Sequence, residues 1–364
     1  MTIILFLIIL AVLVFVHELG HFTSAKLFGI RVDEFAVGFP PKIFSWQKGE
    51  TKYSLNLIPF GGYVKIFGED PDSNSISGPD SARSIVNVSK WKQIVVLLSG
   101  IFLNIIFAWI LISISFNIGM LTSVSDSYTG KIKDAGVVII AVNKNSPAAQ
   151  AGLKEGDFIT NISSEEATVE NPNIVDVQKV IASSSSVINI GIRRGTSTNN
   201  IEVFPTKGIS SEKQSIGIAM DFAGTLKLGF FSSFWEGAKL TVLETKTVTI
   251  GMWKFISGAF GGDKSLISQI SGPIGIAGMV GEAERLGISY LFGFIALISI
   301  NLAVLNAIPF PALDGGRVFF ILIEVIIRRK IKPIILNWVN GIGFALLMAL
   351  MIFITYKDIL KLLK

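Results

Sequence analysis

The sequence has 364 residues, of which half are hydrophobic and 16% are charged, and its mean hydropathy is +0.60. This composition is typical of a polytopic α-helical membrane protein with several spanning helices and one soluble domain of about 100 residues. The net charge of +5 does not indicate a nucleic-acid partner, because basic residues gather in short segments between apolar runs, and the lack of cysteine excludes disulfides and thiolate zinc sites.

The first predicted element is a membrane-spanning helix over residues 1–27. Its apolar run is long enough to cross a bilayer and lacks the basic start and the small-residue cleavage site of a signal peptide. The run leads into the sequence HELGH at residues 17–21. On a helix, His17 and His21 lie one turn apart on one face, where both can bind one zinc ion beside Glu18 as general base. They are the only histidines of the chain, and ionisable groups in a span are costly, which favours a functional role.

Residues 28–92 form a polar segment that we expect on the cytoplasmic side. Within it, residues 53–66 alternate and contain Pro59-Phe60-Gly61-Gly62, which predicts a membrane-associated β-hairpin with its turn at these residues. The edge of such a hairpin can receive an extended peptide as an added strand. An ordinary surface hairpin is the alternative interpretation.

Residues 93–121 predict the second span, which contains Asn104. A single asparagine in a span most often contributes to helix packing, and this is the role we expect for it. Residues 123–208 then predict a soluble α+β domain. Its run SPAAQAGLKEGDFI at residues 146–159, which follows an apolar strand, resembles the PDZ domains of bacterial proteases. A PDZ groove binds an extended chain and captures a terminal carboxylate on backbone N–H groups. We expect the corresponding loop at Ala135, Gly136 and Val137.

Residues 209–287 predict juxtamembrane helices, and residues 288–327 and 334–355 predict the third and fourth spans. Basic residues concentrate between the first and second spans and between the third and fourth. Because basic residues in short loops mark the cytoplasmic side, both termini and the PDZ domain are expected outside the cytoplasm. The expected location is the inner (cytoplasmic) membrane, with multiple passes.

A catalytic zinc site usually has three protein ligands and one open position, so a carboxylate must complete the two histidines. The candidates are Asp33, Glu34, Glu50, Asp314 and Glu324. Asp314 differs from the others because two prolines precede it and two glycines follow it at the end of a span. Such a sequence breaks the helix and allows close backbone approach, which lets the side chain turn inward.

Five motifs together resemble the site-2 protease family of intramembrane zinc metalloproteases, in the arrangement of bacterial members with a single PDZ domain. They are HELGH, GGYVK at residues 61–65, the PDZ run, SGPIGI at residues 271–276, and NAIPFPALDGG at residues 306–316. The resemblance implies that His17, His21 and Asp314 bind Zn²⁺ and that Glu18 is the catalytic base. It also implies that Asn306 helps to orient the substrate and that Gly61 and Gly62 belong to a substrate-handling hairpin. The family's AGPxxN motif reads SGIFLN here, without the proline.

The expected activity is therefore that of a zinc metalloendopeptidase in regulated intramembrane proteolysis. Its expected partners are the lipid bilayer and single-span membrane proteins that are first trimmed outside the membrane, such as anti-sigma factors or remnant signal peptides. Three alternatives are a membrane-anchored protease acting on soluble peptides, a non-catalytic PDZ scaffold and a transporter. The span-end position of the site, the complete ligand set and the absence of an inverted repeat in the sequence argue against them in turn.

Overall fold

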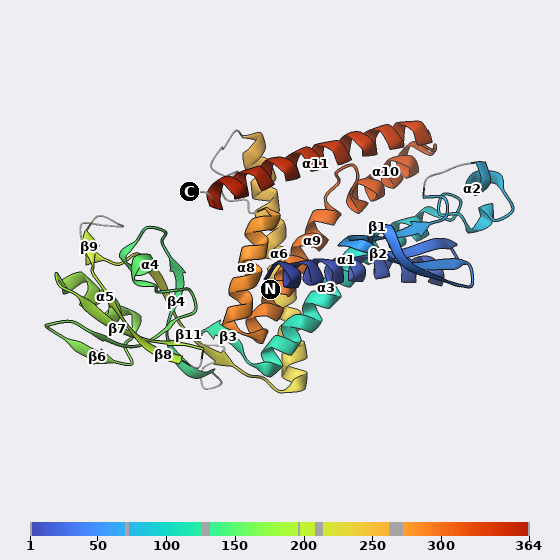
Figure 1. Ribbon diagram of the computed structural model, residues 1–364. Coiled ribbons are helices and arrows are strands. Elements are labelled where there is room, and N and C mark those ends of the chain that lie inside the picture. Colours follow the sequence, from blue (N-terminus) through green and yellow to red (C-terminus); the bar gives the residue numbers. More distant parts are fainter. Residues whose placement is uncertain are drawn as a thin grey trace. The chain divides into compact units, whose positions relative to one another are not determined.

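We describe a computed structural model, which covers residues 2–69, 73–124, 132–195, 197–207, 214–261 and 272–362. The chain forms two compact units, and most of their helices and strands are labelled in Figure 1. The first, the membrane unit, comprises Met1–Ser113, Phe234–Ala283 and Phe292–Lys364, and the second, the sheet unit, comprises Ile114–Ser233 and Glu284–Leu291.

Four helices in the described ranges are long and apolar enough to cross a membrane, which agrees with the predicted number. They are α1 (Thr2–Leu27), α3 (Lys90–Ile118), α9 (Ile288–Ala307) and α11 (Pro333–Leu362). Three further helices belong largely to the membrane unit: α6 (Phe230–Phe260), α8 (Pro273–Leu286) and α10 (Asp314–Ile327). Of the SGPIGI motif, Ser271 lies outside the described residues, and α8 begins at its proline.

Helices α1 and α3 approach closely because glycines face each other across their contact. A Cβ atom added to Gly20 would lie 2.4 Å from the carbonyl oxygen of Ser99 and 2.8 Å from the Cα atom of Gly100. Small residues allow such close packing of membrane helices. The approach positions α3 directly against the HELGH turn of α1.

The predicted hairpin is present, but its turn is elsewhere. Strands β1 (Val32–Lys48) and β2 (Thr51–Ile66) are joined at Gly49 and Glu50, whereas residues 59–62 lie within β2. The prediction of a turn at Pro59–Gly62 is therefore wrong. The strand pairing shows what residues 59–62 do instead. Glu34 of β1 lies opposite both Lys52 and Lys65 of β2, so the two ends of β2 pair with the same part of β1. The segment containing the two glycines carries β2 from one side of β1 to the other, and Gly61, with a φ of 107°, provides the bend.

Between β2 and α3 lie a short helix α2 (Ser73–Ser77) and a 3₁₀ turn (Ser81–Arg83). The hairpin packs on the end of α1 and the start of α3 through one hydrophobic cluster. Its buried members are Ala25, Ile30, Val32, Phe35, Val64, Ile66, Ile85 and Val96. This cluster fixes β2 beside the HELGH turn.

The sheet unit contains one seven-stranded sheet with the order β3-β11-β4-β5-β7-β8, in which β6 also pairs with β5. The strands are β3 (Met120–Ser123), β4 (Ile132–Val142), β5 (Phe158–Ser163), β6 (Thr168–Glu170), β7 (Ile188–Arg194), β8 (Ser197–Val203) and β11 (Ile218–Leu226), and β9 (Thr206–Lys207) pairs with β10 (Gln214–Ser215). Two helices, α4 (Pro147–Ala151) and α5 (Ile174–Ser183), complete the unit.

The SPAAQAG run adopts the local structure that its residues favour. The Ser146 side chain accepts from the backbone N–H of Ala149, Pro147 begins α4, and Gly152 ends it in the left-handed conformation. Serine N-caps, a proline at the first helical position and a glycine just after the helix are each typical of helix ends. The run therefore forms a short capped helix over the apolar core of the unit, of which Ala148 is a fully buried member.

Candidate metal centre

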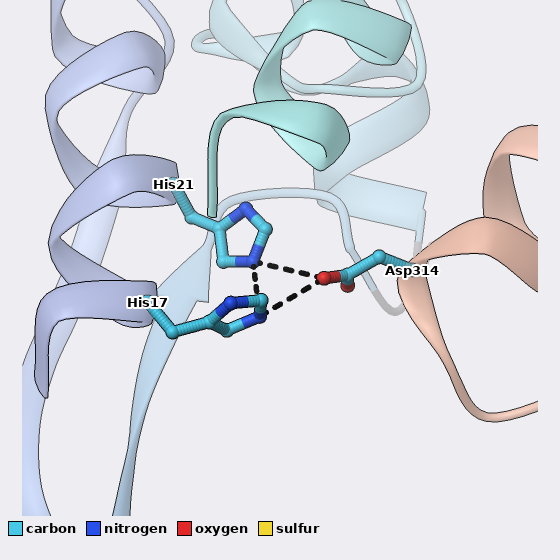
Figure 2. Close-up of side chains that lie close together, drawn as sticks. All are labelled: His17, His21 and Asp314. Carbon is cyan, nitrogen blue, oxygen red and sulfur yellow. Dashed lines mark hydrogen bonds and ion pairs between the residues drawn. The ribbon is translucent and has the colours of Figure 1, made fainter. Parts of the chain in front are cut away.

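Three side chains from two distant helices meet in the membrane unit. His17 and His21 extend from one face of α1, and Asp314 extends from the first residue of α10, so that all three point toward one another (Figure 2). The Nε2 atom of His17 lies 3.0 Å from Asp314 Oδ2, and that of His21 lies 3.3 Å from the same oxygen. The two Nε2 atoms are 3.2 Å apart. Both histidines are only 7% exposed.

These separations fit a tetrahedral zinc ion. Zinc bonds to histidine nitrogen and carboxylate oxygen are about 2.0–2.2 Å long, so two ligand atoms of one tetrahedral ion lie roughly 3.3 Å apart. The three atoms observed here form a triangle of that size, and each side chain offers one ligand atom. A catalytic zinc site has three protein ligands and a fourth position for water, and two imidazole nitrogens with one carboxylate oxygen are one such ligand set.

The orientation of His21 suits this role. Its Nδ1 atom lies 2.8 Å from the backbone carbonyl oxygen of Val96 on α3, and a carbonyl only accepts hydrogen bonds. The hydrogen of the neutral imidazole is therefore on Nδ1, which leaves the lone pair of Nε2 for a metal.

Three residues of α3, spaced four positions apart on one face of the helix, contact the two histidines. They are Val96, Gly100 and Asn104. A Cβ atom on Gly100 would lie 2.6 Å from His21 Nε2 and 2.8 Å from His17 Cε1, so the rings occupy the space that its missing side chain leaves. The amide of Asn104 lies 3.3 Å from His17 Nδ1 and is fully buried. The role in helix packing predicted for Asn104 did not include this contact. Its four-residue spacing from Gly100 was the signal available.

Residues 288–327, which contain the predicted third span and the proline break after it, form two helices that are separated before Asp314. Helix α9 ends at Ala307 and α10 begins at Asp314, and Ala312 between them has a φ of 75°. A Cβ atom on Gly315 would lie 2.4 Å from the carbonyl oxygen of Ala307, so the glycine after Asp314 allows the chain to fold tightly back on the end of α9.

Helix α11 supports the same turn. The backbone N–H of Ala312 donates to Asn340 Oδ1 at 3.2 Å. A Cβ atom on Gly343 would lie 2.6 Å from the Cβ atom of Pro311, which shows how closely α11 approaches the turn. The position of Asp314 thus depends on a helix that follows it in the chain.

Glu18 lies beside His17 on α1 and contacts the hairpin. Its Oε2 atom accepts from the backbone N–H of Val64 in β2 at 3.1 Å. Asn306, near the end of α9, also reaches the site, with its Nδ2 atom 3.5 Å from His17 Nε2. Gly61 and Gly62 lie three and two residues before Val64 in the same strand. The structure therefore brings β2 and the end of α9 to the three-residue cluster of His17, His21 and Asp314.

The other carboxylates considered as third ligand form ion pairs away from the cluster. Asp33 pairs with Arg31, Glu34 with Lys42, and Glu324 with Lys90. Glu50 contacts both Arg83 and Lys26, and these cations lower the pKa of Glu50 to about 2.

The loop expected at Ala135, Gly136 and Val137 is a strand. These residues lie within β4, where Val137 pairs with Phe222 of β11 and with Ile159 of β5, and its side chain is fully buried. The prediction of a loop is wrong because residues 132–136, although they are not an apolar run, pair with β11 and extend the strand. A role of these residues in binding a carboxylate stays a prediction.

Comparisons with known proteins cover almost the whole chain. Residues 5–350 match the model described as Peptidase family M50. A putative zinc metalloprotease of Clostridium perfringens is 35% identical over 99% of both proteins, and the regulator of sigma-W protease RasP of Bacillus subtilis is 30% identical, also over 99% of both. The PDZ domain of an SdrC-like protein of Listeria monocytogenes covers 25% of this chain at 23% identity, with a TM-score of 0.22.

Proposed function

The chain belongs to peptidase family M50, the site-2 proteases, and is a zinc metalloendopeptidase of the membrane; from this premise we propose that it cleaves transmembrane segments of single-span proteins at the three-residue cluster. In this proposal His17, His21 and Asp314 hold the zinc ion and Glu18 is the catalytic base. The observation that carries it is the triangle of 3.0, 3.2 and 3.3 Å formed by two imidazole nitrogens and one carboxylate oxygen.

Zinc, when bound there, supplies the Lewis acidity that activates water and polarises the scissile carbonyl. The chain supplies the proton transfer and the positioning. Glu18 takes a proton from the attacking water and passes it to the leaving amine. Asn306 reaches His17 Nε2 from α9, and we assign its amide to orienting the scissile peptide.

A substrate helix must unwind before cleavage, and its freed backbone groups need new partners in the bilayer. Strand β2 offers them beside the catalytic base, because its Val64 N–H already points at Glu18. We propose that the substrate pairs with the part of β2 that includes Gly61 and Gly62. A substitution of either glycine by a bulky residue should lower cleavage without removing zinc.

We propose that both termini and the sheet unit lie outside the cytoplasm in a multi-pass arrangement, based on the basic residues between the first two spans and the last two. We further propose that the sheet unit, as a PDZ domain, selects substrates already trimmed outside the membrane. Because one relative is named as a regulator of sigma-W, anti-sigma factors are the first substrates to test.

The test is co-expression with a single-span substrate carrying a tag at each end. The parent should release a fragment cut within the span, whereas Glu18→Gln and Asp314→Ala should release none. Glu18→Gln should retain one zinc per chain and Asp314→Ala should lose it. Cleavage by Glu18→Gln at the parent rate would refute the proposed mechanism.

A further inference from the structure

We propose that Asn104 is a positioning residue that holds His17 in the tautomer able to bind zinc. This inference rests on the proposed zinc site and adds to it a residue of α3 that no ligand motif contains. It starts from the amide of Asn104, which lies 3.3 Å from His17 Nδ1 in a fully buried position.

The tautomer of His17 follows from the geometry of the cluster. Its Nε2 atom faces Asp314 Oδ2 and His21 Nε2 at 3.0 and 3.2 Å, so Nε2 must offer the lone pair to the metal. A neutral imidazole carries one hydrogen, which then resides on Nδ1 and requires an acceptor. The Asn104 amide is the group at hydrogen-bonding distance from Nδ1.

An asparagine amide can meet this requirement in one of its two orientations. Rotation by 180° about the last side-chain bond exchanges Oδ1 and Nδ2 with almost no change in shape. With Nδ2 toward the ring, Asn104 Oδ1 is a buried acceptor without a hydrogen-bond partner among the described residues. With Oδ1 toward the ring, the same oxygen accepts from His17 Nδ1–H. The zinc-binding tautomer therefore selects the second orientation.

The two histidines then have equivalent supports from one helix. His21 Nδ1–H donates to the carbonyl oxygen of Val96, and His17 Nδ1–H donates to Asn104 Oδ1, two turns further along α3. Such outer hydrogen bonds fix the ring and raise its basicity, and their loss typically lowers metal affinity by about 10–100-fold. A role in helix packing alone predicts no such effect on zinc.

Zinc affinity of the full chain, measured by competition with a chromophoric chelator, separates these roles. Asn104→Leu removes the acceptor and should lower zinc affinity by about 10–100-fold. Asn104→Asp keeps an acceptor but cannot donate, and should stay within about threefold of the parent. Ser299→Ala is the matched control, because Ser299 is also fully buried and donates to the backbone oxygen of Asn104 without touching the amide.

A second measurement reads the tautomer of His17 directly. The chain has only two histidines, so ¹⁵N labelling of histidine in protein carrying a histidine-free affinity tag gives two imidazoles, which His17→Ala assigns. We expect the zinc-loaded parent to carry a hydrogen on His17 Nδ1, and we expect Asn104→Leu to shift the His17 signals more than those of His21.

Three results would overturn the inference: an unprotonated His17 Nδ1 in the zinc-loaded parent, unchanged zinc affinity in Asn104→Leu, or equal losses in Asn104→Asp and Asn104→Leu. Failure of the zinc site itself gives a different result, namely equal zinc binding by the parent and Asp314→Ala.

Discussion

The backbone N–H of Val64 donates to Glu18 Oε2 at 3.1 Å, although the two residues are 46 positions apart. A strand edge thus meets the side chain proposed as catalytic base. Val64 is anchored by its own side chain, which is buried in the cluster that packs the hairpin on α1 and α3. The contact connects the proposed substrate-binding strand to the proposed chemistry.

Replacement of Val64 by proline should test this connection. Proline removes the backbone donor, and strand positions whose N–H does not pair with a neighbouring strand tolerate it. We expect Val64→Pro to lower the cleavage rate by at least about tenfold while zinc content stays at one per chain, because the base loses a partner that orients it. Val64→Ala keeps the N–H and serves as control. Equal rates for the two variants would show that this hydrogen bond does not matter.

Gly100 should be essential for zinc binding. A Cβ atom there would lie 2.6 Å from His21 Nε2, so Gly100→Ala must displace a ring or separate α1 from α3. We expect zinc affinity to fall by more than about tenfold, as for other changes in ligand support. Gly251→Ala in α6 is the matched control, because no atom lies within 4 Å of its added Cβ. Alanine favours a helix over glycine by about 1 kcal/mol, so a general helix effect would stabilise both variants.

Asn340 should act on the site from α11. Its Oδ1 atom holds the Ala312 N–H two residues before Asp314, and Ala312 has the left-handed φ of 75° that non-glycine residues rarely adopt. We expect Asn340→Leu to lower zinc affinity by about tenfold, whereas Asn340→Asp should retain it. The matched control is Asn337→Ala, one turn earlier on α11. If Asn340→Leu binds zinc like the parent, the turn holds Asp314 without this hydrogen bond.

Glu50 should make the hairpin sensitive to acid. Arg83 and Lys26 lower its pKa to about 2 in the folded protein, from an ordinary value near 4.5. A group with a depressed folded pKa contributes stability above its unfolded pKa and loses it as the pH falls toward the folded value. The difference in melting temperature between the parent and Glu50→Gln should therefore shrink as the pH falls from about 5 to about 2. Because the Glu50 side chain is 32% exposed, we expect at most about 1 kcal/mol at neutral pH. A difference that does not change over this pH range would contradict the assignment.

Asp157 should stabilise the sheet unit without affecting the metal centre. Its fully buried carboxylate accepts from Arg194 through two bonds of 2.6 Å and from the Lys154 N–H at 2.9 Å. Removal of one partner of a buried pair costs about 3–5 kcal/mol, and the 38% exposure of the Arg194 side chain places this pair near the lower end. Asp157→Ala should make the sheet unit more sensitive to proteolysis, with zinc content unchanged. The exposed neighbour Glu155→Ala is the control and should behave like the parent.

Part of this structure could be predicted from interactions between residues that are close in the sequence. The apolar runs predict four spanning helices because only a helix satisfies its own backbone in lipid, and the spacing of His17 and His21 puts both rings on one face by the period of that helix. The serine, proline and glycine of residues 146–152 predict a short capped helix for equally local reasons. Each of these features depends on residues within a few turns of one another.

Only the tertiary structure placed the turn of the hairpin at Gly49 and Glu50, the Asn104 amide at His17, and the Val64 N–H at Glu18. The sequence favoured Asp314 among five carboxylates, but its approach to His17, 297 positions earlier, depends on α11, Gly315 and the α1–α3 contact acting together. Contacts of this kind arise when whole helix faces pack, and the free energy that selects them is shared among many side chains. No local sequence pattern contains this summed free energy. The contacts of Asp314, Asn104 and Val64 could therefore be identified only from the packed structure.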